Sequence, residues 1–200
     1  MNNFSAQTLY DPYIYQLFNV FYAAIPIMIY AVTDREHQAK ILIENEINYY
    51  EQGIRSKLFN SKVFWSWFFF GTWHSIIMVY APYLLIEFNF CYPTGLVQNF
   101  WASGTMVFAL CVLVANIKVI IISNIYNFLS IFMNVMSSLL FLFSLLIFSE
   151  FSSSELYGMA KNLLKIPNFY YGIFLILVST SLLDYGNEMY LSKIFKKIKF

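Results

Sequence analysis

Charged residues are scarce in this sequence of 200 residues. Only 12% of its residues are charged, about half of the roughly 25% that soluble domains carry. Hydrophobic residues make up 60% of the chain, and 22 Phe and 16 Tyr are among them. That many aromatic side chains would be hard to place in a water-soluble core of this size, whereas helices that meet lipid can hold them. The composition therefore predicts an integral membrane protein.

The residue patterns of familiar catalytic chemistry are also missing. There is no Gly-rich phosphate loop, no cluster of metal ligands and no Ser/His/Asp constellation. Cys91 and Cys111 have no metal-binding or redox spacing, so we expect both to pack as small hydrophobic residues. The net charge of +1 gives no reason to expect a nucleic-acid partner. We therefore expect no catalytic residue, no metal site and no cofactor held by these residues.

Five apolar stretches are long enough to cross a membrane. A helix needs about 20 residues to span roughly 30 Å of hydrocarbon. We therefore predict an all-α polytopic membrane fold with five spans, at residues 13–33, 63–86, 97–123, 124–149 and 169–191. An aromatic cluster at residues 64–70 opens the second span and suits a membrane interface.

The basic residues predict how these spans are oriented. Only Lys161 and Lys165, of the twelve Lys and Arg residues, fall on the side that also holds the N-terminus. The other ten fall on the side of the 34–62 loop and the C-terminus, which the positive-inside rule places in the cytosol. The 34–62 loop mixes charges with Ile41, Leu42, Ile43, Ile47 and Tyr50 at helical spacing, so we expect a short amphipathic helix on the membrane surface.

The first span carries one amide, Asn19, and one proline, Pro26. Proline has no N–H, so the carbonyl of Tyr22 loses its helical donor. In lipid, such a carbonyl must find another partner. At the 3.6-residue period, Asn19, Ala23, Pro26 and Tyr30 would share one face, which makes this face the first candidate for function.

Four residues with ionisable side chains lie inside the later spans: His74, Lys118, Asp184 and Glu188. Lys118 and Asp184 both fall toward the predicted cytosolic ends of their spans. Lys118 can snorkel to the interface or form an ion pair with Asp184, because a lone intramembrane charge is costly. His74 is expected to be a packed, hydrogen-bonded residue, with a proton relay as the alternative.

Several short motifs resemble those of one known family. Residues 4–7 (FSAQ), residues 18–21 (FNVF), Pro26 and Asp34 resemble the sixth-span region of type IV P-type ATPases, the phospholipid flippases, whose usual motifs are FSGQ, YNVFFTSLP and FD. Residues 50–53 (YEQG), 112–116 (VLVAN) and 182–184 (LLD) are similar to later parts of that family in the same order. The resemblance covers nearly the whole chain.

The sequence departs from the family's usual pattern at a few positions. Ala6 stands in place of a glycine, Ala23 and Ala24 replace a threonine and a serine, and Leu183 replaces a proline. Loss of the two hydroxyls weakens the expectation that this face hydrogen-bonds a lipid head group in the family's usual way. The phosphorylated-aspartate motif and the other domains of the family do not occur in this sequence, so we interpret it as a C-terminal fragment or a truncated gene model.

The resemblance implies ATP-driven movement of phospholipid from the outer to the cytosolic leaflet of a eukaryotic plasma, Golgi or endosomal membrane. It implies ATP and Mg²⁺ for the full-length enzyme, a two-span glycosylated beta subunit as partner, and no activity for this chain alone. It places Asn19, Tyr22, Ala23 and Pro26 near the lipid path, although Asn19 could instead make an interhelical hydrogen bond and Pro26 could act as a kink. A stand-alone structural or regulatory membrane protein and a small carrier remain the alternatives.

Overall fold

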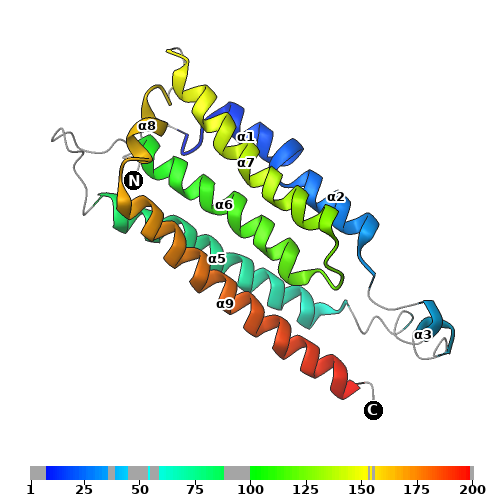
Figure 1. The fold of residues 1–200 in the computed structure, drawn as a ribbon. Helices are drawn as coiled ribbons and strands as arrows, with labels where there is room; N and C mark the ends of the chain where they lie inside the picture. Colours follow the sequence, from blue (N-terminus) through cyan, green and yellow to red (C-terminus); the bar gives the residue numbers. More distant parts are fainter. Residues whose placement is uncertain are drawn as a thin grey trace.

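The computed structural model describes residues 8–35, 39–44, 54, 59–87, 100–152, 154 and 156–198. All regular secondary structure in this part of the chain is helical (Figure 1). Five segments are long and apolar enough to cross a membrane. The predicted all-α polytopic class is therefore confirmed.

The first span, Pro12–Thr33, is built from three consecutive pieces. These are α1 (Pro12–Leu17), the π-helix η1 (Phe18–Tyr22) and α2 (Ala24–Thr33). Asp11 caps α1 by accepting hydrogen bonds from the backbone N–H groups of Tyr13 and Ile14, as an N-cap carboxylate does.

The other four spans are single helices. They are α5 (Ser61–Glu87), α6 (Phe100–Ile122), α7 (Phe128–Glu150) and α9 (Pro167–Ile198). The short helix α8 (Met159–Leu163) connects α7 to α9 at one end of the bundle, and α3 (Ala39–Glu44) lies beyond the opposite end (Figure 1). Helix α3 is the described part of the surface helix that we predicted in the 34–62 loop. Ile43 on it is exposed, whereas Ile47 and Tyr50 lie outside the described residues.

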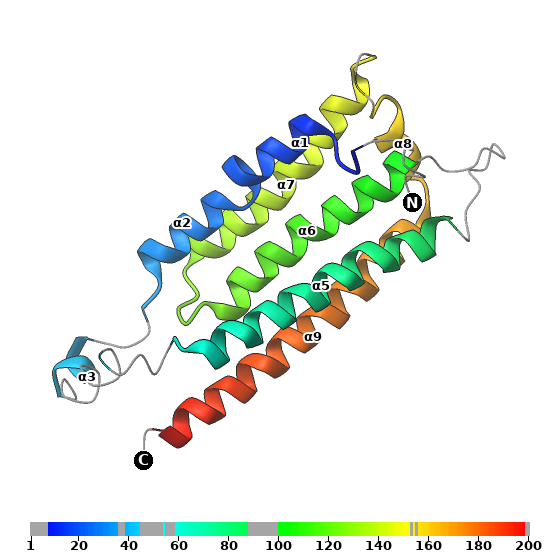
Figure 2. The same ribbon diagram turned by 180° about the vertical axis from the view of Figure 1, so that it is seen from behind.

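Helix α6 is the centre of the bundle. Every residue from 101 to 110 is buried, and α6 packs against α5, α7 and α9, with a smaller contact to α2. In both views α5 and α9 run along one side of α6, whereas α7 and the first span run along the other (Figures 1 and 2). A helix whose apolar residues lie on every side fits this central position.

Small residues let other segments approach the bundle core closely. A Cβ atom built on Gly104 of α6 would lie 2.1 Å from the carbonyl oxygen of Leu9, and one on Gly172 of α9 would lie 2.7 Å from the Met106 side chain. Small residues at such contacts are typical of helix packing in membranes. Leu9, just before α1, is therefore held directly against α6.

Asp34 fastens the end of the first span to the turn between α6 and α7. Its carboxylate accepts hydrogen bonds from the backbone N–H groups of Asn124 (2.9 Å) and Ile125 (3.0 Å) and from the Asn124 side chain (3.1 Å). Partial burial raises the pKa of Asp34, but these hydrogen bonds and one from the Arg35 N–H outweigh it, so the pKa lies below the ordinary value. The carboxylate is therefore charged at neutral pH and holds three helix ends together.

The aromatic cluster at the start of α5 faces outward. Phe64, Trp65, Phe68 and Phe69 are each about half exposed or more, and their rings contact one another edge to face. Cys111 is a free thiol of intermediate exposure, whereas Cys91 lies outside the described residues.

The contact between Gly104 and Leu9 yields a stability prediction. Gly104→Ala forces the Leu9 backbone away from α6, so we expect it to destabilise the protein by about 1–3 kcal/mol. Gly71→Ala is the matched control, because a Cβ on Gly71 of α5 meets no atom within 4 Å. Thermal unfolding in detergent should show a lower midpoint for the first variant and an unchanged or higher midpoint for the second. Equal midpoints would contradict the close approach.

Candidate functional site

The first span does not follow one continuous α-helical period. The N–H of Ala23 donates to the carbonyl of Phe18 at 3.0 Å, a five-residue hydrogen bond that belongs to a π turn. The wider π turn shifts the side chains on either side of it relative to one another. Asn19 is accordingly exposed, whereas Tyr22 and Pro26 are buried. The single face that we expected for Asn19, Ala23, Pro26 and Tyr30 is thus divided.

The divided face gives each predicted residue a separate environment. Asn19 lies among outward-facing side chains with Val20 (57% exposed) and Phe21 (45% exposed). Ala23 is half-buried. Tyr22, only 2% exposed, packs edge to face on Phe141 of α7, and its hydroxyl makes a short contact with Ser144 on the same helix.

The carbonyl of Tyr22 has a protein partner. The Ser137 hydroxyl of α7 donates to it at 2.5 Å, replacing the N–H that Pro26 lacks. Ser137 is buried at 2% exposure, so the hydrogen bond is formed away from lipid and solvent. The sequence predicted that this carbonyl must find another partner, and in the structure that partner is Ser137, which fastens the first span to α7.

Asn116 of α6 extends this hydrogen-bonded chain. Its Nδ2 lies 3.1 Å from the Ser137 hydroxyl and 3.0 Å from the Ser138 hydroxyl. Each serine proton is already donated to a carbonyl, that of Tyr22 or that of Asn134. Both hydroxyls can therefore only accept from Asn116, which fixes its amide with the N–H₂ group toward α7. Three helices are joined in this way at one level of the bundle.

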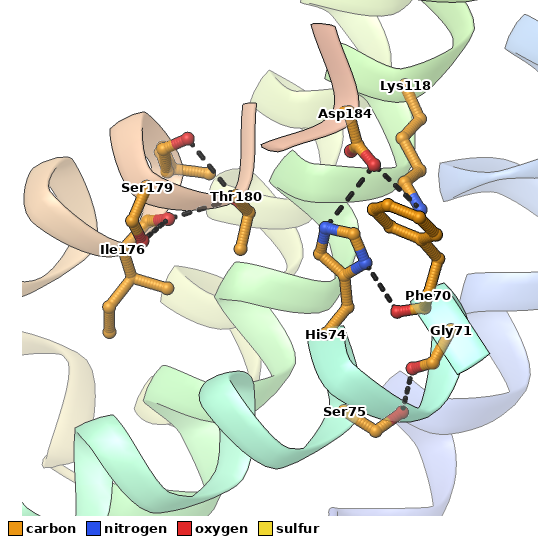
Figure 3. Close-up of polar contacts among 10 residues, drawn as sticks. Phe70, Gly71, His74, Ser75, Lys118, Ile176, Ser179, Thr180 and Asp184 are labelled. Carbon is orange, nitrogen blue, oxygen red and sulfur yellow. Dashed lines mark hydrogen bonds and ion pairs between the residues drawn. The ribbon is translucent and has the colours of Figure 1, made fainter. Parts of the chain in front are cut away.

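A second polar group joins α5, α6 and α9. The Nζ atom of Lys118 lies 3.4 Å from Oδ1 of Asp184, and Nε2 of His74 lies 3.3 Å from the same oxygen (Figure 3). The Asp184 side chain is 10% exposed and that of Lys118 is 24% exposed. Lys118 thus faces the carboxylate while keeping partial access to the surface, and its charge is balanced within the bundle.

One ring nitrogen of His74 has a clear donor role in this group. Its Nδ1 lies 2.7 Å from the carbonyl oxygen of Phe70, which can only accept, so Nδ1 carries the proton. Nε2 is at ion-pair distance from Asp184 but lacks hydrogen-bond alignment to any described residue. His74 is 2% exposed, in keeping with the packed, hydrogen-bonded role that the sequence favoured over a proton relay.

The sequence reasoning missed the polar residues of α7. Their signal was present as a buried stripe at helical spacing, which consists of Ser130, Asn134, Ser137, Phe141, Leu145 and Ser149. Serines in an apolar span give little indication of which neighbour they face, and this explains why Ser137 was not linked to Pro26.

Comparison with known proteins supports the family that the motifs resemble. A family model described as "Phospholipid-translocating P-type ATPase C-terminal" matches residues 1–197. Phospholipid-transporting ATPase IH of Mus musculus is 27% identical over 138 residues, which cover 69% of this chain and 12% of that protein. A phospholipid-transporting ATPase of Schizosaccharomyces pombe is 26% identical over 199 residues, which cover 94% of this chain and 16% of that protein. The chain thus spans only a small part of the length of either relative.

The hydrogen bond from Ser137 yields a double-mutant prediction. Ser137→Ala leaves the Tyr22 carbonyl without a donor, so we expect it to destabilise the bundle by about 1 kcal/mol. In a Pro26→Ala background the new N–H can serve that carbonyl, so the same change should have a smaller effect. Reversible unfolding in mixed micelles would measure both steps.

Ser138→Ala is the matched control for that cycle, because it removes a hydroxyl partner of Asn116 without touching Tyr22. Its effect should be the same with Pro26 and with Ala at that position. If the effect of Ser137→Ala were also the same in both backgrounds, the assignment of Ser137 to the freed carbonyl would be wrong.

The charged group yields a second test. Lys118→Asp and Asp184→Lys each place two like charges together inside the bundle, so each single variant should lower the yield of folded protein several-fold. The double variant restores opposite charges and should recover most of that yield. Glu150 and Lys161 form an exposed pair with Oε1 and Nζ 2.7 Å apart. The same exchange at this pair should change the yield of folded protein little. Absence of recovery in the Lys118/Asp184 double variant would exclude a structural ion pair.

Proposed function

This chain belongs to the phospholipid-translocating P-type ATPase family and forms part of its C-terminal membrane region, and from this we propose that it supplies one wall of a path along which phospholipid crosses the membrane. The observation that carries the proposal is the split first span. Its proline and π turn are held by α7 on one side, while Asn19 is left outward on the other. In a five-helix bundle stabilised on its inner side, that outward amide is a hydrogen-bonding group available to a passing head group.

The four first-span residues have different roles in this proposal. Asn19 contacts the lipid, because its side chain is exposed and an amide can both donate and accept hydrogen bonds. Tyr22 and Pro26 shape the path, because both are buried against the bundle. Ala23 leaves room beside the π turn without a polar contact of its own.

Lys118 and Asp184 are structural in this proposal. They lie with His74 in the contacts among α5, α6 and α9, whereas the first span packs on α7 and touches α6 on the other side. The charged group therefore stabilises the supporting helices and does not meet the lipid.

We further propose that the whole enzyme moves phospholipid from the outer to the cytosolic leaflet, hydrolyses ATP with Mg²⁺, and works with a two-span glycosylated beta subunit. Plasma, Golgi or endosomal membranes are the proposed locations. Among the described residues no three His, Cys, Asp or Glu side chains come together as a metal site. We assign no Mg²⁺ to the described residues, and propose that the chain alone hydrolyses no ATP.

Transport by the complete polypeptide tests the role of Asn19. We expect Asn19→Ala to lower lipid uptake and lipid-stimulated ATP hydrolysis about five- to tenfold, the effect of one lost hydrogen bond. Asn162→Ala on α8 is the control, because this amide is also exposed but does not belong to the first span. Both variants should elute as the unaltered protein does on size-exclusion chromatography.

Wild-type transport and head-group selectivity in the Asn19→Ala variant would overturn the assignment. Lipid movement by the protein without ATP would instead favour the small-carrier alternative. A structural or regulatory protein would show neither lipid movement nor lipid-dependent hydrolysis.

A further inference from the structure

A second exposed amide lies on the first span, just before Asn19. Gln16 of α1 is exposed, as Asn19 of η1 is, and residues three apart on a helix are neighbours on its surface. Neither amide forms a hydrogen bond with any described residue. The two side chains are therefore neighbouring hydrogen-bonding groups on the outward surface of the span, and the proposed function uses only one of them.

The first span has no charge with which to bind a head group. Residues 12–33 contain no Asp, Glu, Lys or Arg, and Gln16 and Asn19 are the only amides among them. Beside these amides, Tyr15 (53% exposed) and Val20 (57% exposed) present apolar surface. An amide that faces hydrocarbon without a partner is costly, and a polar head group passing along this surface would supply that partner.

The two amides lie at different depths in the span. Gln16 is four residues after the start of α1 and Asn19 is three residues further along, about 6 Å and 10 Å into the span at 1.5 Å per residue. The basic residues predict that this end of the span lies on the non-cytosolic side. A lipid from the outer leaflet would therefore pass Gln16 first and Asn19 second.

The order of the two amides assigns a different part of the lipid to each. In the proposed function, which this inference rests on, the head group enters ahead of the acyl chains, so its terminal group leads and its phosphate follows. When the terminal group reaches Asn19, the phosphate is nearer the level of Gln16. Phosphate oxygens only accept hydrogen bonds, and the N–H₂ group of glutamine donates them. We propose that Gln16 is a second head-group contact, which donates from Nε2 to the phosphodiester while Asn19 meets the terminal group.

This division separates affinity from selectivity. Glycerophospholipids share the phosphodiester and differ in the terminal group. Gln16 therefore contributes equally to the binding of every transported head group, and any discrimination between head groups along the first span falls to Asn19.

Substitutions at Gln16 test both the contact and the direction of its hydrogen bond. ATP hydrolysis by the complete polypeptide, in micelles with increasing phosphatidylserine, phosphatidylethanolamine or phosphatidylcholine, gives a half-saturating fraction for each lipid that stimulates it. Gln16→Leu removes the donor and should raise this fraction about five- to tenfold, the effect of one hydrogen bond, and equally for each such lipid. Gln16→Lys keeps a donor and should stay near the unaltered value. Gln16→Glu repels the phosphate and should raise the fraction further.

A matched control and a second readout separate contact from structural damage. Thr72→Leu on α5 also replaces an exposed polar residue of a span, but the Thr72 hydroxyl donates to the carbonyl of Phe68 in its own helix at 2.9 Å. Helix α5 runs along the other side of α6 from the first span (Figures 1 and 2), so this variant should leave the half-saturating fraction unchanged. Gln16→Leu should keep its maximal rate within about twofold, because at saturation the lost binding no longer limits the rate.

The outcomes distinguish this inference from the proposed function. Tighter lipid binding by Gln16→Glu than by Gln16→Lys would show that Gln16 accepts a hydrogen bond, and would overturn its assignment to the phosphate. An effect of Gln16→Leu on one head group alone would overturn it as well. An unaltered half-saturating fraction in Gln16→Leu, together with reduced transport in Asn19→Ala, would reject Gln16 and leave the proposed function standing. Unaltered behaviour of both variants would reject both.

Discussion

The hydrogen bond from Ser137 to the Tyr22 carbonyl is the interaction on which the arrangement of the bundle depends. Pro26 removes the helical donor of that carbonyl, and lipid cannot replace it. Because Ser137 supplies the missing proton, it must accept from Asn116, and the amide of Asn116 is oriented as a result. One absent N–H in the first span is therefore compensated by side chains on two other helices.

The same constraint separates the amide that faces outward from the polar groups that hold the first span in place. On the first span, the π turn turns Asn19 outward and Pro26 inward, so the exposed amide is distinct from the part that holds the helix in place. On the far side of α7, the serines use both N–H groups of Asn116 and leave its oxygen unpaired. A proline in a membrane helix thus affects the arrangement of neighbouring helices, because those helices must supply the hydrogen bond that the proline cannot make.

Much of the fold could be predicted from run length and charge. Five apolar runs gave five spans, four of them single helices. The isolated charges Lys118 and Asp184 were considered as partners because both fall near the same ends of parallel spans. The π turn could not be predicted, because a 3.6-residue period was assumed for a segment whose residues do not distinguish α from π geometry. Ser137 and His74 were not linked to Tyr22 and Asp184, because a sequence does not state which faces of two helices meet.

The infrared frequency of the Tyr22 carbonyl, isotope-labelled at that one position, tests the central claim most directly. A carbonyl bonded to the Ser137 hydroxyl absorbs at lower frequency than a free one, so Ser137→Ala should shift the labelled band upward, and restoring a donor with Pro26→Ala should move it back. A band that stayed in place when Ser137 was replaced would show that the carbonyl freed by Pro26 has another partner. That result would contradict the hydrogen-bonded connection from the first span through Ser137 to Asn116.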